Sequence, residues 1–406
     1  MRRAAPVLLA LLVAGAAGCG KSKTASTRIT SDTLSIYTSL PLRGERADDG
    51  RAVLRGEKLA LEEAGGRVGD VEIGLKALDD TRTSSGRWDP KQASENAKQA
   101  AEDPTTIAYI GDLDSGASAV SVPITNATGV LQVSPLSTYT GLTQAADKGE
   151  PAKYYPSGRR TFARLVPPGS LEARTLAAWV SSKGFQRVTL AYDGFQEGLG
   201  QASELERALQ AAGVEVLDVI RIDAGGQPPD VTSEARDIAR APAGAMVYAG
   251  ASVPAAATLI RAVHQIDPGV TYFVTSGVAR AGLAASVDSA ERQVNAISPL
   301  LPVDRRPAAA QRVADRYQEL FGAPAPAAAL YGYEAMRTVL DAIERAKDGK
   351  DRRSVIDAYL ATSATDSVIG TYAIGKDGDT TATGYGAYRV TDGRLRFEHP
   401  LVAAAN

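Results

Sequence analysis

Ser115 is the residue whose type and position point most clearly to binding chemistry. It falls where a strand-like run ends and a helical run begins. Its hydroxyl and the unpaired backbone amides behind it can receive a carboxylate or another electron-rich group. Ligands in α/β sheets bind at the carboxyl ends of the strands, so we expect Ser115 to contact a ligand. The alternative is that Ser115 only caps its helix.

The sequence contains no motif that is typical of catalysis or of metal binding. The two histidines, His264 and His399, lack the neighbours of a metal site or of a catalytic base. No Gly-x-Ser-x-Gly elbow occurs, and in residues 370–377 (GTYAIGKD) an aspartate stands where a phosphate loop needs Ser or Thr. We therefore predict a protein that is not an enzyme and that holds no metal and no cofactor.

The elements that must position Ser115 follow an alternating pattern. Short β-type runs alternate with helical stretches from Leu34 onward, which is typical of parallel strands joined by helices. A second series of the same kind begins after Arg164, and the chain turns helical again beyond Pro299. A chain of this length exceeds one hydrophobic core, so the pattern predicts two lobes that are discontinuous in sequence.

The first residues have the pattern of an export signal. Arg2 and Arg3 precede an apolar run over residues 7–14 and a small-residue stretch that ends at Cys19, the only cysteine. Residues 16–19 (AAGC) resemble a bacterial lipobox, which usually has Leu at the first of these positions. We predict a signal peptide at 1–18, lipidation of Cys19 and a flexible tether over 19–33. The alternative is ordinary cleavage beside an incidental cysteine.

The charge balance limits the partners. The chain has 45 basic and 47 acidic residues, a formal net charge of −2, so no excess of charge would attract nucleic acid. No later segment approaches the roughly 20 apolar residues of a spanning helix. We predict a secreted protein that is held on the outer side of the bacterial cytoplasmic membrane by its lipid anchor, and we expect a monomer.

Several segments together resemble the substrate-binding proteins of branched-chain amino acid transporters, the leucine/isoleucine/valine-binding type. The resemblance covers nearly the whole mature chain, and its order and spacing make coincidence improbable. The segments are residues 39–44 (SLPLRG), 79–80 (DD), 88–90 (WDP), 110–116 (IGDLDSG), 133–138 (VSPLST), 141–143 (GLT), 162–164 (FAR), 331–336 (YGYEAM), 370–372 (GTY) and 377–379 (DGD).

The resemblance implies two Rossmann-like lobes with central parallel sheets, joined by a hinge of three crossings. We place the N-terminal lobe at 34–165 plus 298–363 and the C-terminal lobe at 166–297 plus 364–406. The ligand would lie in the cleft between the lobes and be presented to a permease.

The resemblance also implies ligand contacts beyond Ser115. Leu136, Ser137 and Thr138 follow a second strand, where the family orients the polar end of the ligand, although they could equally form a turn after Pro135. Phe195 stands where family members commonly carry a Tyr that closes over the ligand. For Phe195, packing in the core is the alternative.

One departure from the family concerns the substrate. Members that hold an amino acid place an acidic residue, which pairs with the ammonium group of the ligand, where this chain has Ser276. A buried ammonium without a charged partner costs several kcal/mol. Asp112 and Asp114 could supply the charge, or they could be helix-start or surface carboxylates. Weaker cleft candidates, each of which could be a packing residue instead, are Tyr331, Tyr248, Arg43 and Trp88.

The sequence thus favours a receptor that closes on a small polar solute, an amino acid or an amide-like molecule, and hands it to the permease of an ABC transporter. A ligand sensor of the same fold, coupled to a signalling partner, is an alternative from a different class. An exported α/β enzyme is a third, and it would require a nucleophile or a metal constellation.

Overall fold

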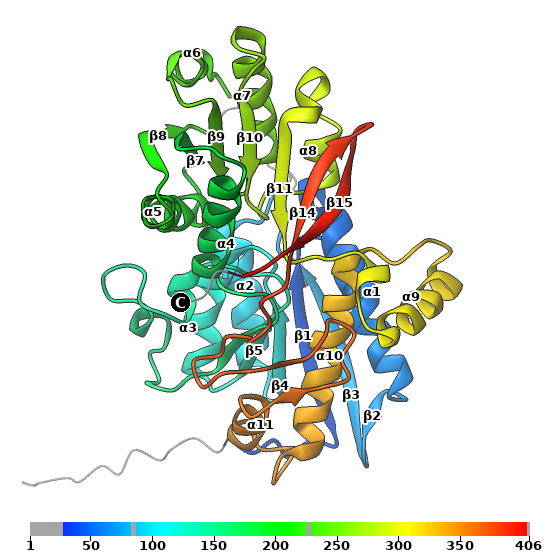
Figure 1. Cartoon of the computed structure of the whole chain (residues 1–406). Coiled ribbons are helices and arrows are strands. Elements are labelled where there is room, and N and C mark those ends of the chain that lie inside the picture. Colours follow the sequence, from blue (N-terminus) through cyan, green and yellow to red (C-terminus); the bar gives the residue numbers. More distant parts are fainter. Residues whose placement is uncertain (1–26, 83–86, 225–228, 404–406) are drawn as a thin grey trace, which may run out of the picture.

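The computed structural model describes residues 27–82, 87–224 and 229–403. Figure 1 shows two α/β lobes, each built around its own sheet, with the chain passing between them. The predicted fold class is therefore confirmed. The predicted signal peptide and Cys19 lie outside the described residues. Within the described ranges, no helix combines the length and the apolar composition that a membrane crossing requires.

The first lobe contains, among the described residues, a six-stranded sheet in the order β2-β3-β1-β4-β5-β6. Its pairs are parallel except for β2 and β3. Parallel pairing brings the carboxyl ends of β1, β3, β4 and β5 to one edge. The strands are β1 (Thr33–Leu40), β2 (Arg67–Val68), β3 (Val71–Asp79), β4 (Thr106–Gly111), β5 (Leu131–Ser134) and β6 (Phe162–Arg164).

The helices of the first lobe are α1 (Ala47–Glu63), α2 (Pro90–Glu102), α3 (Ser115–Ala127), α9 (Ala308–Phe321), α10 (Ala327–Arg345) and α11 (Arg352–Tyr359). α2 begins at Pro90 because Asp89 caps it, accepting from the amide of Gln92 at 2.9 Å, and a proline is favoured at the first helical position. α1 and α10 cross so closely that a Cβ on Gly332 would lie 2.7 Å from the carbonyl carbon of Val53. Only glycine fits at that crossing.

The second lobe contains, in its described part, a seven-stranded sheet in the order β15-β14-β11-β10-β9-β7-β8. The strands are β7 (Arg187–Asp193), β8 (Glu215–Ile222), β9 (Ala245–Ala249), β10 (Thr271–Val274), β11 (Val294–Ser298), β14 (Tyr385–Thr391) and β15 (Arg394–Leu401). The helices are α4 (Gly169–Ser182), α5 (Gln196–Ala211), α6 (Thr232–Arg240), α7 (Val253–Ile266) and α8 (Ala281–Ala284).

The edge of the second sheet is antiparallel. β14 pairs antiparallel with β11, and β15 pairs antiparallel with β14. Asp392 and Gly393 join β14 to β15 with φ values of 52° and 65°, the left-handed conformation of a tight two-residue hairpin turn. Short 3-10 helices occupy other connections: η1 (Gly44–Arg46), η2 (Thr140–Leu142), η3 (Ala152–Tyr154), η4 (Asp288–Gln293) and η5 (Val303–Arg305).

Three passages of the described chain join the lobes: β6 to α4, β11 to α9, and β13 to β14. β12 (Ser363–Ala364) and β13 (Tyr372–Ala373) form a small hairpin that precedes the third passage. The predicted lobe boundary after residue 363 is too early. Ala364, Tyr372 and Ile374 are buried in the core of the first lobe, so the chain enters the second lobe only between Ile374 and Tyr385.

Arg164 ties two of these passages together. Its side chain is fully buried, and its Nε lies 2.7 Å from a carboxylate oxygen of Asp379 in the third passage. Its Nη1 donates to the carbonyl of Tyr139 at 2.7 Å, and its Nη2 donates to Thr143. A single guanidinium therefore fixes the hinge relative to the loop that follows β5.

The last part of the predicted tether is packed rather than free. Ile29 is buried in the core of the first lobe, and its amide donates to the carbonyl of Lys350 at 2.7 Å. Arg28 pairs with Asp348 at 2.6 Å. The expectation of a flexible segment up to residue 33 is thus wrong for residues 27–32, because Ile29 supplies the large apolar side chain that lets this segment dock.

Candidate functional site

The carboxyl ends of the two sheets face each other across a small cavity. Its volume is about 10 Å³, and it is lined by Pro41, Glu45, Arg46, Arg87, Trp88, Asp114 and Ala251. Ala251 belongs to the loop between β9 and α7 in the second lobe, and the other residues belong to the first lobe. The lobes are in direct contact here, since the amide of Val253 donates to Glu45 at 3.1 Å. The structure thus represents a closed arrangement.

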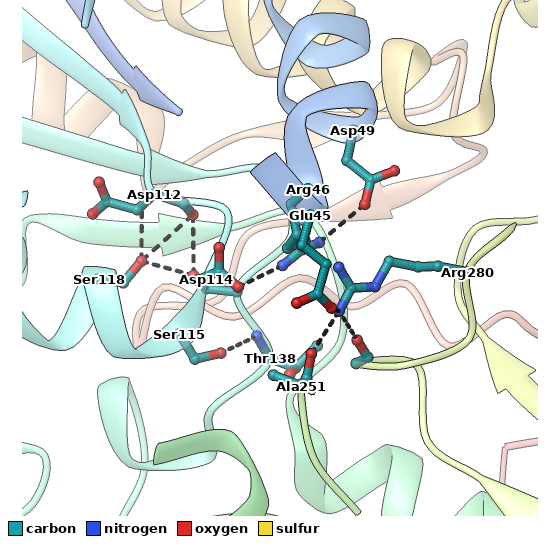
Figure 2. Close-up of polar contacts among 12 residues, drawn as sticks. Glu45, Arg46, Asp49, Asp112, Asp114, Ser115, Ser118, Thr138, Ala251 and Arg280 are labelled. Atoms are coloured by element: carbon teal, nitrogen blue, oxygen red, sulfur yellow. Dashed lines mark hydrogen bonds and ion pairs between the residues drawn. The ribbon is translucent and has the colours of Figure 1, made fainter. Parts of the chain in front are cut away.

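Ser115 lies at the start of α3, as predicted, and is fully buried. Its Oγ accepts from the amides of Thr138 and Tyr139, each at 3.1 Å, so it joins the end of β4 to the loop after β5. The N-cap position of α3, the alternative role for Ser115, is occupied by Asp114. Ser115 thereby holds the backbone of Thr138 beside the first turn of α3 (Figure 2).

The neighbouring candidates differ in what they present. Ser137 is fully buried, and its hydroxyl bonds to Ser118 at 2.7 Å and to the carbonyl of Asp112 at 3.1 Å. Leu136 packs in the core of the first lobe. Thr138 is only half-buried, and its hydroxyl has no hydrogen bond to any other residue in the described ranges. Thr138 is the member of this group that has a polar atom available for a ligand.

Asp112 and Asp114, both buried, have different partners. Asp114 lines the cavity and pairs with Nη1 of Arg46 at 2.8 Å. Asp112 accepts from the hydroxyls of Tyr109, at 3.0 Å, and Ser121. Burial raises the pKa of Asp112 to about 6, although these two hydroxyls hold it down. Asp112 is therefore a structural carboxyl behind the site. A position on the surface, which the sequence left open as an alternative for both aspartates, is wrong for each of them.

Replacing Asp112 with asparagine should change the pH dependence of stability. The pKa of Asp112 is about 6 in the folded chain and about 3.9 in an unfolded chain. The folded state therefore binds this proton more tightly, and the wild type loses about 2–3 kcal/mol of stability from this group between pH 4 and pH 7. D112N lacks this loss, so its stability relative to wild type should rise by that amount over the same range. Urea unfolding at pH 4, 5, 6 and 7 measures it.

Asp48→Asn is the control, because the Asp48 side chain is almost fully exposed. Parallel curves for wild type and D112N between pH 4 and pH 7 would contradict the assignment.

The second-lobe candidates lie around Asp193. Phe195 is half-buried, and the guanidinium of Arg87 stacks on its ring at 3.8 Å, so it meets the first lobe at the cleft. Tyr248 is fully buried, with its hydroxyl 3.5 Å from Asp193, behind the cleft rather than on its surface. Asp193 accepts from the amides of Ala251 and Ser252 at 2.7 and 2.8 Å, which places Ala251 against the cavity.

Ser276 has a carboxylate beside it that the sequence did not indicate. Glu172, at the start of α4, is fully buried and accepts from the amide of Ser276 at 2.7 Å and from its hydroxyl at 2.5 Å. The acid is 104 positions away in the sequence, and no local motif connects the two residues. The hydroxyl of Ser276 is thus engaged within its own lobe.

Two weaker candidates lie away from the cavity. Tyr331 donates to the carbonyl of Pro299 at 3.0 Å and accepts from Arg306, which places it beside the second passage between the lobes. Arg43 binds Asp79 and the carbonyl of Thr81 on an exposed part of the first lobe. Trp88, in contrast, lines the cavity and packs on Gly116.

Charged residues that sequence reasoning missed meet where the lobes touch (Figure 2). Arg280 reaches from the second lobe, and its Nη2 lies 3.7 Å from Glu45 of the first. Arg46 pairs with both Asp114 and Asp49. Glu45 and Arg46 directly follow residues 39–44, and Arg280 lies four positions after Ser276. The signal that could have found them is that a charged residue follows each of these predicted segments within a few positions.

Asp80 is a further missed residue at this edge. It directly follows β3, is fully buried, and neither of its carboxylate oxygens has a hydrogen-bond partner in the described part of the chain. Burial, followed by the charges of Asp112, Asp114 and Asp79, raises the pKa of Asp80 well above its usual range.

Comparisons with known proteins give the family and the fold of the chain. A curated relative, Leu/Ile/Val-binding protein homolog 3 of Brucella melitensis, is 25% identical over 371 residues, which span 89% of this chain and 92% of the relative. A leucine-binding protein, LivK, from Thermotoga maritima shares the fold with a TM-score of 0.79 at 22% identity, covering 91% of this chain and 99% of that one.

A solute-binding protein of an ABC transporter from R. palustris, solved with benzoate, has a TM-score of 0.75 at 18% identity and covers 92% of this chain and 98% of its own. The resemblance to branched-chain amino acid binding proteins is thus confirmed. The family model described as periplasmic binding protein matches residues 36–394. Since this match spans most of the sequence, the chain belongs to the periplasmic binding protein family.

Proposed function

We propose that this chain captures a small polar solute in the cleft between its lobes by hinge closure and delivers it to the permease of an ABC transporter. The observation that carries the proposal is the closed cavity, which Ala251 of the second lobe and Trp88 and Asp114 of the first lobe bound together. Such a site buries its ligand on both sides, so solute binding favours the closed form. The permease would recognise that form.

The relatives support a binding role. The Brucella relative and the Thermotoga protein carry names of amino acid binding proteins, and the R. palustris protein was solved with benzoate. We propose that the chain acts outside the cytoplasmic membrane, tethered through a lipid on Cys19. A sensor of the same fold remains the second candidate, and a neighbouring permease or kinase gene would separate the two.

A thermal-shift screen over amino acids, amides, urea, short peptides and aromatic acids tests the binding role. A solute that binds only the folded chain stabilises it by about 2.7 kcal/mol at a hundred times its Kd. We expect one class to raise Tm and the other classes to leave it unchanged. A screen in which no solute shifts Tm would contradict the proposed function.

Thr138→Val should weaken solute binding without weakening the fold. The amide of Thr138 bonds to Ser115 and its carbonyl to Gly169, so removing only the hydroxyl leaves both contacts in place. We expect affinity to fall roughly 5- to 15-fold, the effect of one lost hydrogen bond, with Tm of the unliganded protein unchanged. Calorimetric titration with the solute from the screen measures the change.

Thr33→Val is the matched control for this hydroxyl. Thr33 is also half-buried, but it begins β1 at the amino end of the sheet, opposite the cleft. Equal losses of affinity in T33V and T138V, or no loss in T138V, would remove Thr138 from the site.

A further inference from the structure

Arg280 is held by the second lobe at the point where the two lobes meet. Its Nη2 donates to the carbonyls of Ala251 and Gly277 at 2.7 and 2.6 Å. Ala251 lines the cavity, and so does Glu45, whose carboxylate lies 3.7 Å from the same nitrogen. Figure 2 shows the Arg280 side chain extended toward Arg46 and Glu45. One nitrogen thus anchors the guanidinium beside the cavity.

The other two nitrogens of Arg280 are without a hydrogen-bond partner in the described part of the chain. Nε and Nη1 are buried and have no hydrogen-bond partner within residues 27–82, 87–224 and 229–403. Buried donors are almost always satisfied in folded proteins, because an unsatisfied donor keeps the full cost of losing water. Burial and the nearby charge of Arg46 lower the pKa of Arg280, while the carboxylates of Asp49, Glu45 and Asp114 act against this. An acceptor with negative charge would satisfy the two unpartnered nitrogens and further stabilise the guanidinium.

The acids that line the cavity, Glu45 and Asp114, already have partners in the protein, and so does the neighbouring Asp49. Asp114 and Asp49 both pair with Arg46, at 2.8 and 3.5 Å. Glu45 accepts from the amide of Val253 at 3.1 Å and faces Arg280. Asp80 is fully buried and is not among the residues that line the cavity. An ammonium group entering the cavity would have to displace one of these internal pairs. An anion could instead accept from Nε and Nη1 of Arg280, which have no partner among the described residues.

We propose that Arg280 receives the acidic group of the solute, and that the solute is a carboxylate without a charged amino group. This inference rests on the function proposed above and narrows its substrate class. It makes Arg280 a specificity-determining residue, because a neutral amide of the same shape cannot neutralise the guanidinium. A zwitterion would bring an ammonium group, and both carboxylates that line the cavity, Glu45 and Asp114, already have protein partners.

Matched probes test the proposal without any substitution. Calorimetric titration of the full chain uses 4-methylpentanoate, 4-methylpentanamide and L-leucine, and then benzoate, benzamide and L-phenylalanine. Within the series that fits the cavity, we expect the acid to bind at least tenfold more tightly than both the amide and the amino acid. Inorganic phosphate and sulfate are included because they offer negative charge without a carboxylate, and we expect neither to compete.

Arg280→Met should then weaken binding of the preferred acid by about 10- to 100-fold, the effect of losing charged hydrogen bonds. Arg280→Lys should keep part of the affinity, since it keeps a charge but not the planar donors. Arg261→Met is the matched control: Arg261 lies on α7 of the same lobe and donates to the carbonyl of Ser286 at 2.8 Å. Circular dichroism establishes that each variant is folded.

The outcomes separate this inference from the proposed function. An amide or amino acid that binds as tightly as its matched acid, tighter binding of phosphate, or unchanged acid binding in a folded R280M would overturn the role of Arg280. In those cases a solute still binds, and the receptor function stands. Failure of every probe and of every solute in the wider screen would overturn both proposals.

Discussion

Replacing Arg164 with methionine is expected to lower the free energy of unfolding by about 3–5 kcal/mol, as when one partner of a buried ion pair is removed. Arg164 is fully buried, and Asp379, 2.7 Å from its Nε, keeps only Gln144 as a side-chain partner among the described residues once the guanidinium is gone. The carbonyl of Tyr139 loses one donor as well and keeps the amide of Leu142 at 3.3 Å. Urea unfolding followed by circular dichroism measures the change.

The same substitution should also weaken solute binding, because Arg164 holds the carbonyls of Ser137 and Tyr139 on either side of Thr138. Arg28→Met is the control, since Arg28 forms its ion pair with Asp348 at the surface with about half of its side chain exposed. Exposed pairs contribute about 0–1 kcal/mol. An R164M variant that unfolds within 1 kcal/mol of wild type would show that the hinge does not depend on this guanidinium.

Replacing Gly116 with alanine should disturb the wall of the cavity directly. A Cβ at this position would lie 3.0 Å from Cη2 and 3.2 Å from Cε2 of Trp88, and closer still to Cζ2. The indole must shift, and because Trp88 lines the cavity, the shift changes the space that a solute occupies. We expect affinity to fall about tenfold or more and stability to fall by about 1–3 kcal/mol, the usual range for overpacking.

Gly282→Ala provides the comparison for this change. Its Cβ would meet only Cγ1 of Val253, at an ordinary contact distance of 3.6 Å. Calorimetric titration and urea unfolding of both variants should show an effect in G116A alone. Wild-type affinity in G116A would place the solute away from the indole.

The fold could be predicted because its signals are local. The alternation of strands and helices, and signals such as Asp89 and Pro90 at the start of α2, lie within single segments. The lobe boundary after residue 363 was misplaced because the assignment of residues 364–374 depends on which core buries Tyr372 and Ile374. Strands as short as β12 show no alternation of apolar and polar residues, so the sequence does not indicate to which lobe they belong.

The site could be predicted only in part, for a related reason. Ser115, Asp114 and Trp88 were found because they follow strand ends or fall in recognisable segments, and the structure places them at or beside the cavity. The contacts of Glu45 with Val253 and of Ser276 with Glu172 join residues 208 and 104 positions apart. The first pair joins the two lobes and the second lies within one lobe, and both form only in the folded chain. No spacing in the sequence predicts them.

A crystal structure of the full chain with the solute that most raises Tm in the screen tests the central claim most directly. We predict density for one solute molecule enclosed between the start of α3 and the loop that follows β9, in contact with Arg280 and the hydroxyl of Thr138. Density for the solute outside the space between the lobes, with that space still filled by the pairs Arg46–Asp114 and Glu45–Arg280, would contradict it.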